Sequence, residues 1–242
     1  MDSMRIGILK VDSVLPEFRS RHGDYPEMLI QILKLNSMDD KRKLRFKTFD
    51  VERGDYPKHI DDFDGYIIPG SRKSVYDRNY WIEVLKEFVT TLDAKRKKLV
   101  GVCFGHQLIA EVLGGKTERC DRGWGVGVHE TQIHKPPWFT QNHPKTCSLA
   151  VSHRDQVSKL PNRAELIASN KFCPHSMFAI EKHIFSMQGH PEFTLQYAMD
   201  LLQARREILG ESTYGNALKS LSISTDRNAV AAWIVEFFSS KG

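Results

Sequence analysis

The sequence predicts an α/β protein with a mainly parallel sheet, because apolar strand segments and amphipathic helical segments alternate through its first half. Short runs rich in Ile, Leu and Val are typical of buried strands and occupy residues 4–11, 44–51, 64–68 and 98–102. Apolar residues at helical spacing follow the first, third and fourth of these runs, at 25–33, 81–92 and 108–113. Strands that alternate with helices pair in parallel through right-handed crossovers.

Two of these helices carry clear end signals. Asp24 precedes Tyr25, Pro26 and Glu27, and an Asp cap followed by an early proline predicts a helix start. The helix at 108–113 is predicted to stop at the two glycines 114–115, where the chain is free to leave the helical conformation.

The pattern changes after residue 116. Shorter strands without intervening helices are predicted at 124–133, 147–151, 164–169 and 184–187, and we expect extra short antiparallel strands in this half of the chain. Two helices then follow, one beginning near Phe193 and one after Asp226, and the polar segment 210–225 between them is predicted to be a surface loop. We expect one domain over residues 1–242, with a core at about 4–205 and a helical extension at 206–242.

Composition excludes several classes of protein. Of the 242 residues, 40% are hydrophobic and 27% charged, the balance of a globular protein with a core rather than a disordered chain. The net charge of +5 comes partly from the basic runs 41–43 and 95–98, which we interpret as solvated helix ends and loops; binding to nucleic acid or membrane is not expected. Four widely spaced cysteines and no export signal predict a reduced, cytoplasmic protein.

Cys103 is the candidate nucleophile. It lies in the segment 101–107 (GVCFGHQ), which follows an apolar strand and opens a helix, the form of a nucleophile elbow with Cys in place of Ser. Glycines on either side relieve collisions at so sharp a turn, and the helix N-terminus favours a thiolate. The backbone N–H of Phe104 would point into the same space and stabilise an oxyanion. The alternative is a buried structural cysteine between packing glycines.

A candidate base with its own carboxylate follows the strand at 184–187. In His190-Pro191-Glu192, the proline keeps His190 extended, so His190 and Glu192 project to one face and the carboxylate can fix the imidazole tautomer. The alternative is a turn in which Glu192 caps the next helix. His153 and Asp155 repeat the spacing without a proline, and we rank them second as a base and favour a binding role. Spacings typical of a metal site are missing from the sequence.

These motifs together resemble the class I glutamine amidotransferases, the Cys-His-Glu family. The matching segments, which fall in the family's order, are 69–71 (PGS), 101–107 (GVCFGHQ), 152–155 (SHRD) and 188–192 (QGHPE). The resemblance implies a flavodoxin-like sheet flanked by helices, with Cys103 as nucleophile, His190 as base and Glu192 as its orienter. It also implies an oxyanion hole formed by the N–H groups of Gly70 and Phe104. It further implies γ-glutamyl-binding roles for four residues: Gln107, His153, Arg154 and Asp155.

The most similar branch comprises the stand-alone GMP-synthase-like amidotransferases and the γ-glutamyl peptidases. Many glutaminase domains have glycine where this chain has Arg154, so its pocket differs there. The resemblance implies hydrolysis of a γ-glutamyl amide through a cysteine thioester, without metal or cofactor. If ammonia leaves, the chain serves a separate synthetase; if an amine leaves, it is a γ-glutamyl peptidase acting on glutathione-type conjugates. A non-catalytic regulatory protein on the same fold is the third alternative.

Overall fold

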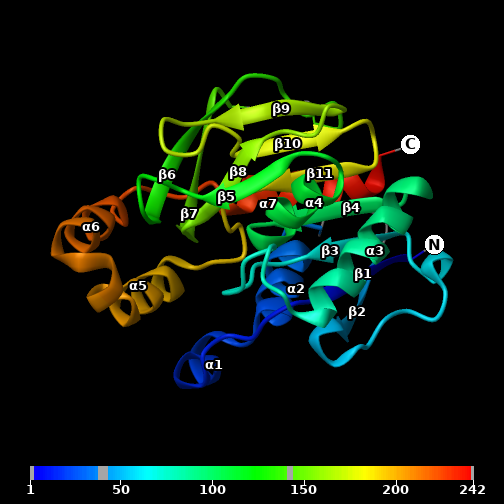
Figure 1. Ribbon diagram of the computed structural model, residues 1–242, viewed down its shortest axis with the longest axis horizontal. Coiled ribbons are helices and arrows are strands. Elements are labelled where there is room, and N and C mark those ends of the chain that lie inside the picture. The colour runs from blue at the N-terminus through cyan, green and yellow to red at the C-terminus, as the bar shows by residue number, and fades with distance from the viewer. Residues whose placement is uncertain (1–2, 38–42, 141–143, 241–242) are drawn as a thin grey trace.

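The computed structural model describes residues 3–37, 43–140 and 144–240, and its centre is a nine-stranded sheet in the order β2-β1-β3-β4-β11-β10-β9-β6-β7 (Figure 1). The five strands of its parallel half are β1 (Met4–Lys10), β2 (Leu44–Asp50), β3 (Gly65–Ile68), β4 (Lys98–Val102) and β11 (Ile184–Met187). Their spatial order, 2-1-3-4 followed by the last strand, is the flavodoxin-like order, in which ligands bind outside the carboxyl ends of the strands. The α/β, flavodoxin-like prediction is therefore confirmed.

The other half of the sheet is antiparallel, as predicted for the second half of the chain. Its strands are β6 (Gly125–Ile133), β7 (Thr146–His153), β9 (Ala164–Ser169) and β10 (Met177–Ile180). A separate antiparallel pair joins β5 (Lys116–Arg119) to β8 (Asp155–Lys159). The sequence patterns missed β5 and β8, which are mostly polar and so lack an apolar run, and they also missed β10.

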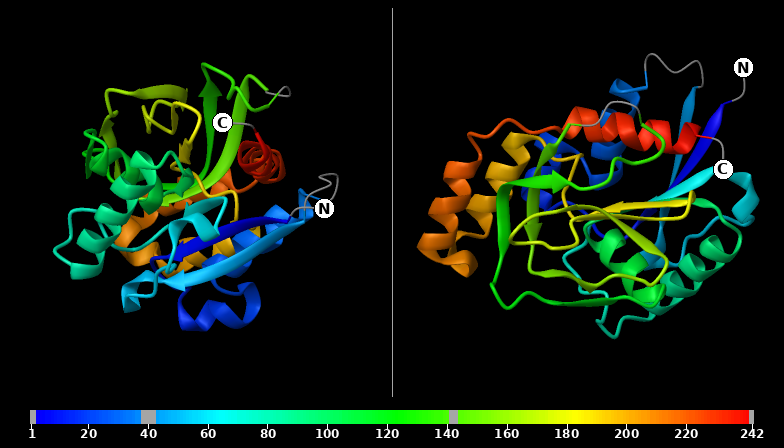
Figure 2. Two further views of the ribbon diagram at one scale, coloured as in Figure 1. Left: turned by 90° about the vertical axis from the view of Figure 1, so that its right-hand side faces the viewer. Right: turned by 90° about the horizontal axis from the view of Figure 1, so that it is seen from above.

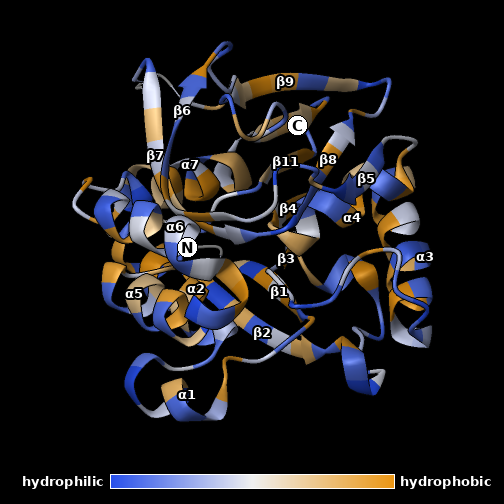
Figure 3. Ribbon diagram, turned by 60° about the vertical axis from the view of Figure 1, so that its left-hand side comes forward, coloured by the Kyte–Doolittle hydropathy of each residue, from blue (hydrophilic) through white to orange (hydrophobic). Residues whose placement is uncertain are grey.

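Helices cover both faces of the parallel half and bury its apolar strands. On one face, α2 (Tyr25–Leu35) and α7 (Arg227–Ser239) share a core cluster with β1, and Figure 2 shows α7 lying along the strands. On the other face lie α3 (Tyr80–Ala94) and α4 (Phe104–Val112), which pack on β3 and β4. Asp24 caps α2 as predicted, in a capping box with Glu27. In Figure 3 hydrophobic and hydrophilic residues alternate along α3, as an amphipathic helix requires.

Three further helices lie at the end of the molecule away from α3: α1 (Pro16–His22), α5 (Leu195–Ala204) and α6 (Arg206–Ser220) (Figure 1). The predicted surface loop at 210–225 is wrong for most of its length, because residues up to Ser220 belong to α6. Gly210, at φ 73°, interrupts that helix, and two buried residues, Leu209 and Ala217, attach it to β6. A helix that buries only a narrow stripe of side chains can be mostly polar, and this composition is the reason that the sequence predicted a loop here.

Residues of the basic run at 95–98 form ion pairs within the fold. Lys95 and Lys97 pair with Asp61, and Arg96 pairs with Glu181. The run at 41–43 lies outside the described residues except for Lys43. Within the described ranges, every helix is too short or too polar to cross a membrane.

Candidate active site

Cys103 occupies a strained turn between β4 and α4. Its backbone has φ 51° and ψ −100°, a conformation that few side-chain-bearing residues adopt. A Cβ on Gly101 would lie 2.7 Å from the backbone carbon of Gly105, and a Cβ on Gly105 would collide with the carbonyl oxygen of Ile68. The flanking glycines are therefore needed for the steric reason that the sequence predicted. The turn is anchored by the Cys103 N–H, which donates to the Met187 carbonyl of β11 at 2.9 Å.

His190 and Glu192 form a buried pair beside this turn. Strand β11 lies next to β4 in parallel, so the segment after β11 reaches the same sheet edge as Cys103. The Nδ1 atom of His190 lies 2.7 Å from Oε1 of Glu192, and both side chains are buried. The His190 N–H donates to the Ala150 carbonyl at 2.9 Å, and the His190 ring stacks on Phe193 with centroids 3.9 Å apart. The imidazole therefore has a fixed position and tautomer.

The charge of His190 is governed by its two polar neighbours. Burial by itself lowers the pKa of His190, but the charges of Glu192 and Cys103 and the hydrogen bonds to both side chains outweigh it and raise the pKa well above 6.5. A cationic imidazole beside a cysteine is one of the arrangements that can activate a cysteine as nucleophile.

Gly70, which follows β3, lies against both His190 and Cys103. A Cβ on Gly70 would lie 2.8 Å from Cε1 of His190 and 3.5 Å from Cβ of Cys103. Phe104 is the first residue of α4, and an N–H in that position has no partner within its own helix. The two predicted oxyanion donors thus lie on the two segments that meet at Cys103. Gly70 lies on the segment that follows β3, the strand next to β4, and Phe104 directly follows Cys103 in the chain.

A pocket of about 280 Å³ opens in front of Cys103. All four predicted γ-glutamyl-binding residues line it. Its remaining walls come from the loop after β3, from Trp124 before β6 and Ser152 of β7, and from Arg205 and Ile208 at the junction of α5 and α6. Its lining residues are Ser71, Arg72, Lys73, Ser74, Cys103, Gln107, Trp124, Ser152, His153, Arg154, Asp155, Arg205 and Ile208.

Gln107 and Asp155 are joined to each other and are buried in the pocket wall. The Gln107 Nε2 donates to the Asp155 carbonyl at 2.7 Å and to Oε1 of Gln188 at 3.0 Å. Ser74 donates a hydrogen bond to Oδ2 of Asp155, whereas the buried Oδ1 has no hydrogen-bond partner among the described residues. A buried carboxylate oxygen without a donor is costly.

His153 does not pair with the Asp155 carboxylate, although the spacing allowed it. Its Nδ1 lies 3.0 Å from the Asp155 backbone carbonyl, so this nitrogen carries the proton. Burial lowers the pKa of His153 to about 3, which keeps the ring neutral at neutral pH. Arg154 reaches the pocket too, with its guanidinium carbon 5.6 Å from the centre of the Trp124 ring.

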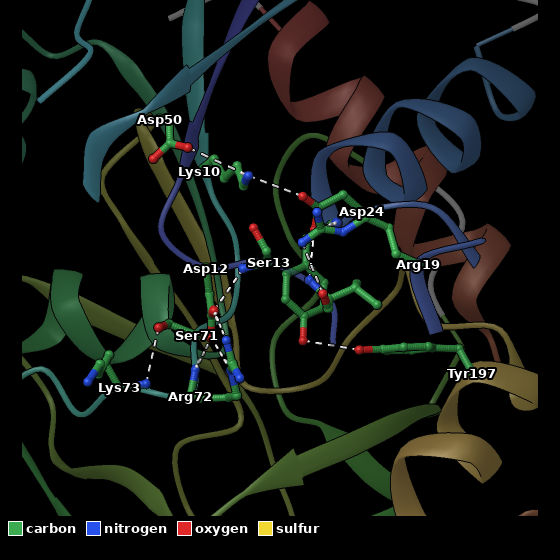
Figure 4. A network of polar contacts seen from close by, with 12 residues as sticks. Lys10, Asp12, Ser13, Arg19, Asp24, Asp50, Ser71, Arg72, Lys73 and Tyr197 are labelled. Carbon is green, nitrogen blue, oxygen red and sulfur yellow. Dashed lines mark hydrogen bonds and ion pairs between the residues drawn. The ribbon is translucent and has the colours of Figure 1, made fainter. Parts of the chain in front are cut away.

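The sequence patterns missed Asp12, which follows β1 at the same sheet edge (Figure 4). Its Oδ2 accepts hydrogen bonds from the backbone N–H of Arg72 at 2.7 Å and from Nε of Arg72 at 2.9 Å, and its Oδ1 accepts from Nη2 at 2.7 Å. Asp12 therefore holds the loop that begins at Gly70. Its position immediately after the first strand was the available signal, since carboxyl ends of parallel strands carry functional residues.

Metal ligands were not expected. Among residues 3–37, 43–140 and 144–240, no group of three or more His, Cys, Asp or Glu side chains is placed to hold a metal ion.

Comparison with known proteins agrees with the fold and with the motifs. The family model for glutamine amidotransferase class-I matches residues 34–205. γ-Glutamyl peptidase 3 of Arabidopsis thaliana is 34% identical over 166 residues, covering 65% of this chain and 67% of that protein. A glutamine amidotransferase-like protein of Schizosaccharomyces pombe is 30% identical over 247 residues, covering 96% and 97%. One subunit of the glutamine-hydrolysing GMP synthase of Archaeoglobus fulgidus is 28% identical over 169 residues, covering 69% and 87%.

Solved structures show the same fold at low identity. The crystal structure of a glutamine amidotransferase from Thermotoga maritima superposes with a TM-score of 0.71 at 17% identity, covering 99% of this chain and 97% of that one. The fold and the matched segments define an α/β amidotransferase-like protein. The chain belongs to the class-I glutamine amidotransferase family.

Proposed function

We propose that this protein is an enzyme that hydrolyses a γ-glutamyl amide through a thioester on Cys103. The observation that carries the proposal is the strained turn of Cys103 beside the buried His190–Glu192 pair, at the mouth of a pocket lined by the carboxylic side chain of Asp155. The γ-glutamyl peptidases and the glutamine-hydrolysing GMP synthase found among its relatives support the same chemistry.

In the first half of the reaction, His190 takes the proton of Cys103, and the sulfur attacks the γ-carbonyl carbon of the substrate. The N–H groups of Gly70 and Phe104 hold the oxyanion that forms. His190 gives its proton to the leaving nitrogen as the C–N bond breaks, which leaves a γ-glutamyl thioester. Glu192 stabilises the imidazolium throughout.

In the second half, His190 takes a proton from water as the water oxygen attacks the thioester carbon. The C–S bond then breaks, glutamate leaves, and the sulfur recovers the proton through His190. Gln107 and the Ser74–Asp155 pair line the position of the γ-glutamyl group, and Asp155 supplies the charge opposite to its α-ammonium. His153 is neutral and acts as part of the pocket wall rather than as a base.

The test is release of glutamate from glutamine, glutathione and a γ-glutamyl dipeptide by the purified chain, with Cys103→Ala as control. We expect turnover of at least one compound by the wild type, none by the variant, and a γ-glutamyl adduct on Cys103 in acid-quenched protein by mass spectrometry. Turnover by Cys103→Ala, or by neither protein, would overturn the proposal and, in the second case, favour a non-catalytic role.

A glutaminase that supplies ammonia to a separate synthetase is the second candidate, favoured by the similarity to the GMP synthase of Archaeoglobus fulgidus. Preferential hydrolysis of glutamine, stimulated by a partner in cell extract, distinguishes it from a peptidase.

A further inference from the structure

The pocket in front of Cys103 contains more positive charge than a γ-glutamyl group can balance. Four cationic side chains line it, those of Arg72, Lys73, Arg154 and Arg205, against the single carboxylate of Asp155. Arg72 is already neutralised by Asp12. Within the described part of the chain, the other three cations have no carboxylate within ion-pair distance.

Arg154 and Arg205 are held together in one wall of the pocket. Their guanidinium carbons lie 5.6 Å and 5.3 Å from the centre of the Trp124 ring. Arg205 Nη1 donates to Oγ of Ser152 at 2.6 Å, and the backbone carbonyl of Arg154 accepts the Cys120 N–H at 2.8 Å. The Trp124 ring and, for Arg205, the Ser152 hydroxyl therefore hold the two guanidinium groups in the pocket wall, where both keep N–H donors for an anion.

A count of charges then indicates what the anion belongs to. At neutral pH a γ-glutamyl group carries one α-ammonium, which the acidic side chain of Asp155 balances, and one α-carboxylate, which balances one cation. Lys73 lines the pocket one residue before Ser74, the hydrogen-bond donor to Asp155, and supplies that cation. Arg154 and Arg205 remain. Beside them Trp124 and Ile208 offer apolar surface that the polar γ-glutamyl group does not need.

We propose that Arg154 and Arg205 bind a carboxylate on the leaving-group side of the scissile bond. The preferred substrates are then γ-glutamyl amides whose leaving amine is an amino acid or short peptide with a free carboxyl group, and its side chain packs on Trp124 and Ile208. This inference rests on the proposed function and narrows its substrate class. It also gives Arg154 a role at the position where many glutaminase domains have glycine.

Three compounds test the inference on the wild-type protein: γ-glutamylalanine, its C-terminal amide, and glutamine. They share the γ-glutamyl group, and only the first has a carboxylate on its leaving group. We expect kcat/KM for the free acid to exceed that for the amide on the order of ten- to a hundredfold, the range of one charge-assisted hydrogen bond. Glutamine, which loses ammonia, is expected to be a poorer substrate than the acid.

Substitution of the arginines provides the matching test. Arg154→Gln and Arg205→Gln should each raise KM for the acid and remove most of the ratio of kcat/KM for the acid to kcat/KM for the amide. Arg53→Gln removes the same charge from a side chain that is 86% exposed, and it should leave the preference unchanged. Binding of the two dipeptides to Cys103→Ala by calorimetry gives the same comparison without turnover.

Equal rates for the acid and the amide, or a preference for glutamine, would overturn the inference and leave the proposed hydrolysis intact. A wild-type preference that survives both arginine substitutions would also overturn it. If the folded wild type hydrolyses neither these three compounds nor glutathione, the proposed function itself fails and this inference with it.

Discussion

The carboxylate of Asp12 binds both the guanidinium group and the backbone N–H of Arg72 (Figure 4). Asp12 follows β1 and Arg72 follows β3, which is the strand next to β1, so this pair ties the loop after Gly70 to the centre of the sheet. The loop carries a proposed oxyanion donor at one end and Ser74, the hydrogen-bond donor to Asp155, at the other. One buried carboxylate thus sets the position of both ends of the proposed substrate site.

Asp12→Asn should lower kcat more than it raises KM, because the weakened pair lets Gly70 move away from the developing oxyanion. The free energy of unfolding should also fall by about 1–2 kcal/mol, a modest figure because the Arg72 side chain is half exposed and its charge is screened. Urea denaturation and steady-state kinetics on a γ-glutamyl substrate measure both effects.

The stability difference between wild type and Asp12→Asn should depend on pH in a defined direction. Burial raises the pKa of Asp12, but the hydrogen bonds and charge of Arg72 outweigh it and hold the pKa below 3.8. A lowered carboxyl pKa stabilises the fold above the unfolded-state pKa, and this contribution is lost as the pH falls through the folded-state value. The difference should therefore be constant near neutral pH and shrink below about pH 4. A difference that grows in acid would contradict this account of the pair.

Glu192→Gln should reduce kcat on the order of 10²- to 10⁴-fold while the protein stays folded, as expected when a catalytic imidazole loses the carboxylate that orients it. The Glu192 charge raises the pKa of His190, so its removal lowers that pKa. The alkaline limb of the pH profile of kcat/KM should then move to lower pH. Glu83→Gln, a change on the exposed surface of α3, serves as control and should preserve both the rate and the profile. An unchanged alkaline limb in Glu192→Gln would show that another group sets it.

The residues that sequence reasoning placed correctly are those whose chemistry demands a local pattern. A nucleophile on a strand-to-helix turn needs Gly101 and Gly105 close beside it in the chain, and the His190–Glu192 contact spans only two residues. Both could therefore be predicted from short segments. The parallel half of the sheet was predictable for a similar reason, since each buried strand is a continuous apolar run.

Contacts between segments that are far apart in the sequence leave no such local pattern in it. Asp12 and Arg72 are 60 residues apart, and Arg205 joins Trp124 only because α5 ends beside the pocket. His153 shows the opposite failure. Its spacing to Asp155 matched that of His190 to Glu192, but within a bonded strand pair the ring faces a backbone carbonyl instead of the carboxylate. Spacing decides which side chains can meet, and packing decides which of them do.

Alkylation with a limiting amount of iodoacetamide at neutral pH should modify Cys103 in preference to the other three cysteines. All four thiols are buried, but only Cys103 lines the pocket. Burial raises the pKa of Cys147 to about 12 and that of Cys173 to about 11, so both remain protonated and unreactive. Peptide mapping by mass spectrometry identifies the modified residue, and a γ-glutamyl substrate should protect it. Equal labelling of Cys103 and Cys147 in the folded protein would contradict a thiolate role for Cys103.

Gly70→Ala should reduce kcat by about one to two orders of magnitude, because small displacements of reacting groups have large effects on rate. The new methyl group would lie 2.8 Å from Cε1 of His190, closer than real Cβ contacts allow, so the imidazole has to move away from Cys103. Gly215→Ala is the matched control: it makes the same substitution within α6, where nothing lies within 4 Å of the added carbon. That variant should retain full activity and gain up to about 1 kcal/mol in stability from helix propensity. Because both variants add one methyl group, a loss of activity confined to Gly70→Ala locates the effect at the Cys103–His190 contact. Full activity in Gly70→Ala would show that the reacting groups do not depend on the close approach of Gly70 to His190.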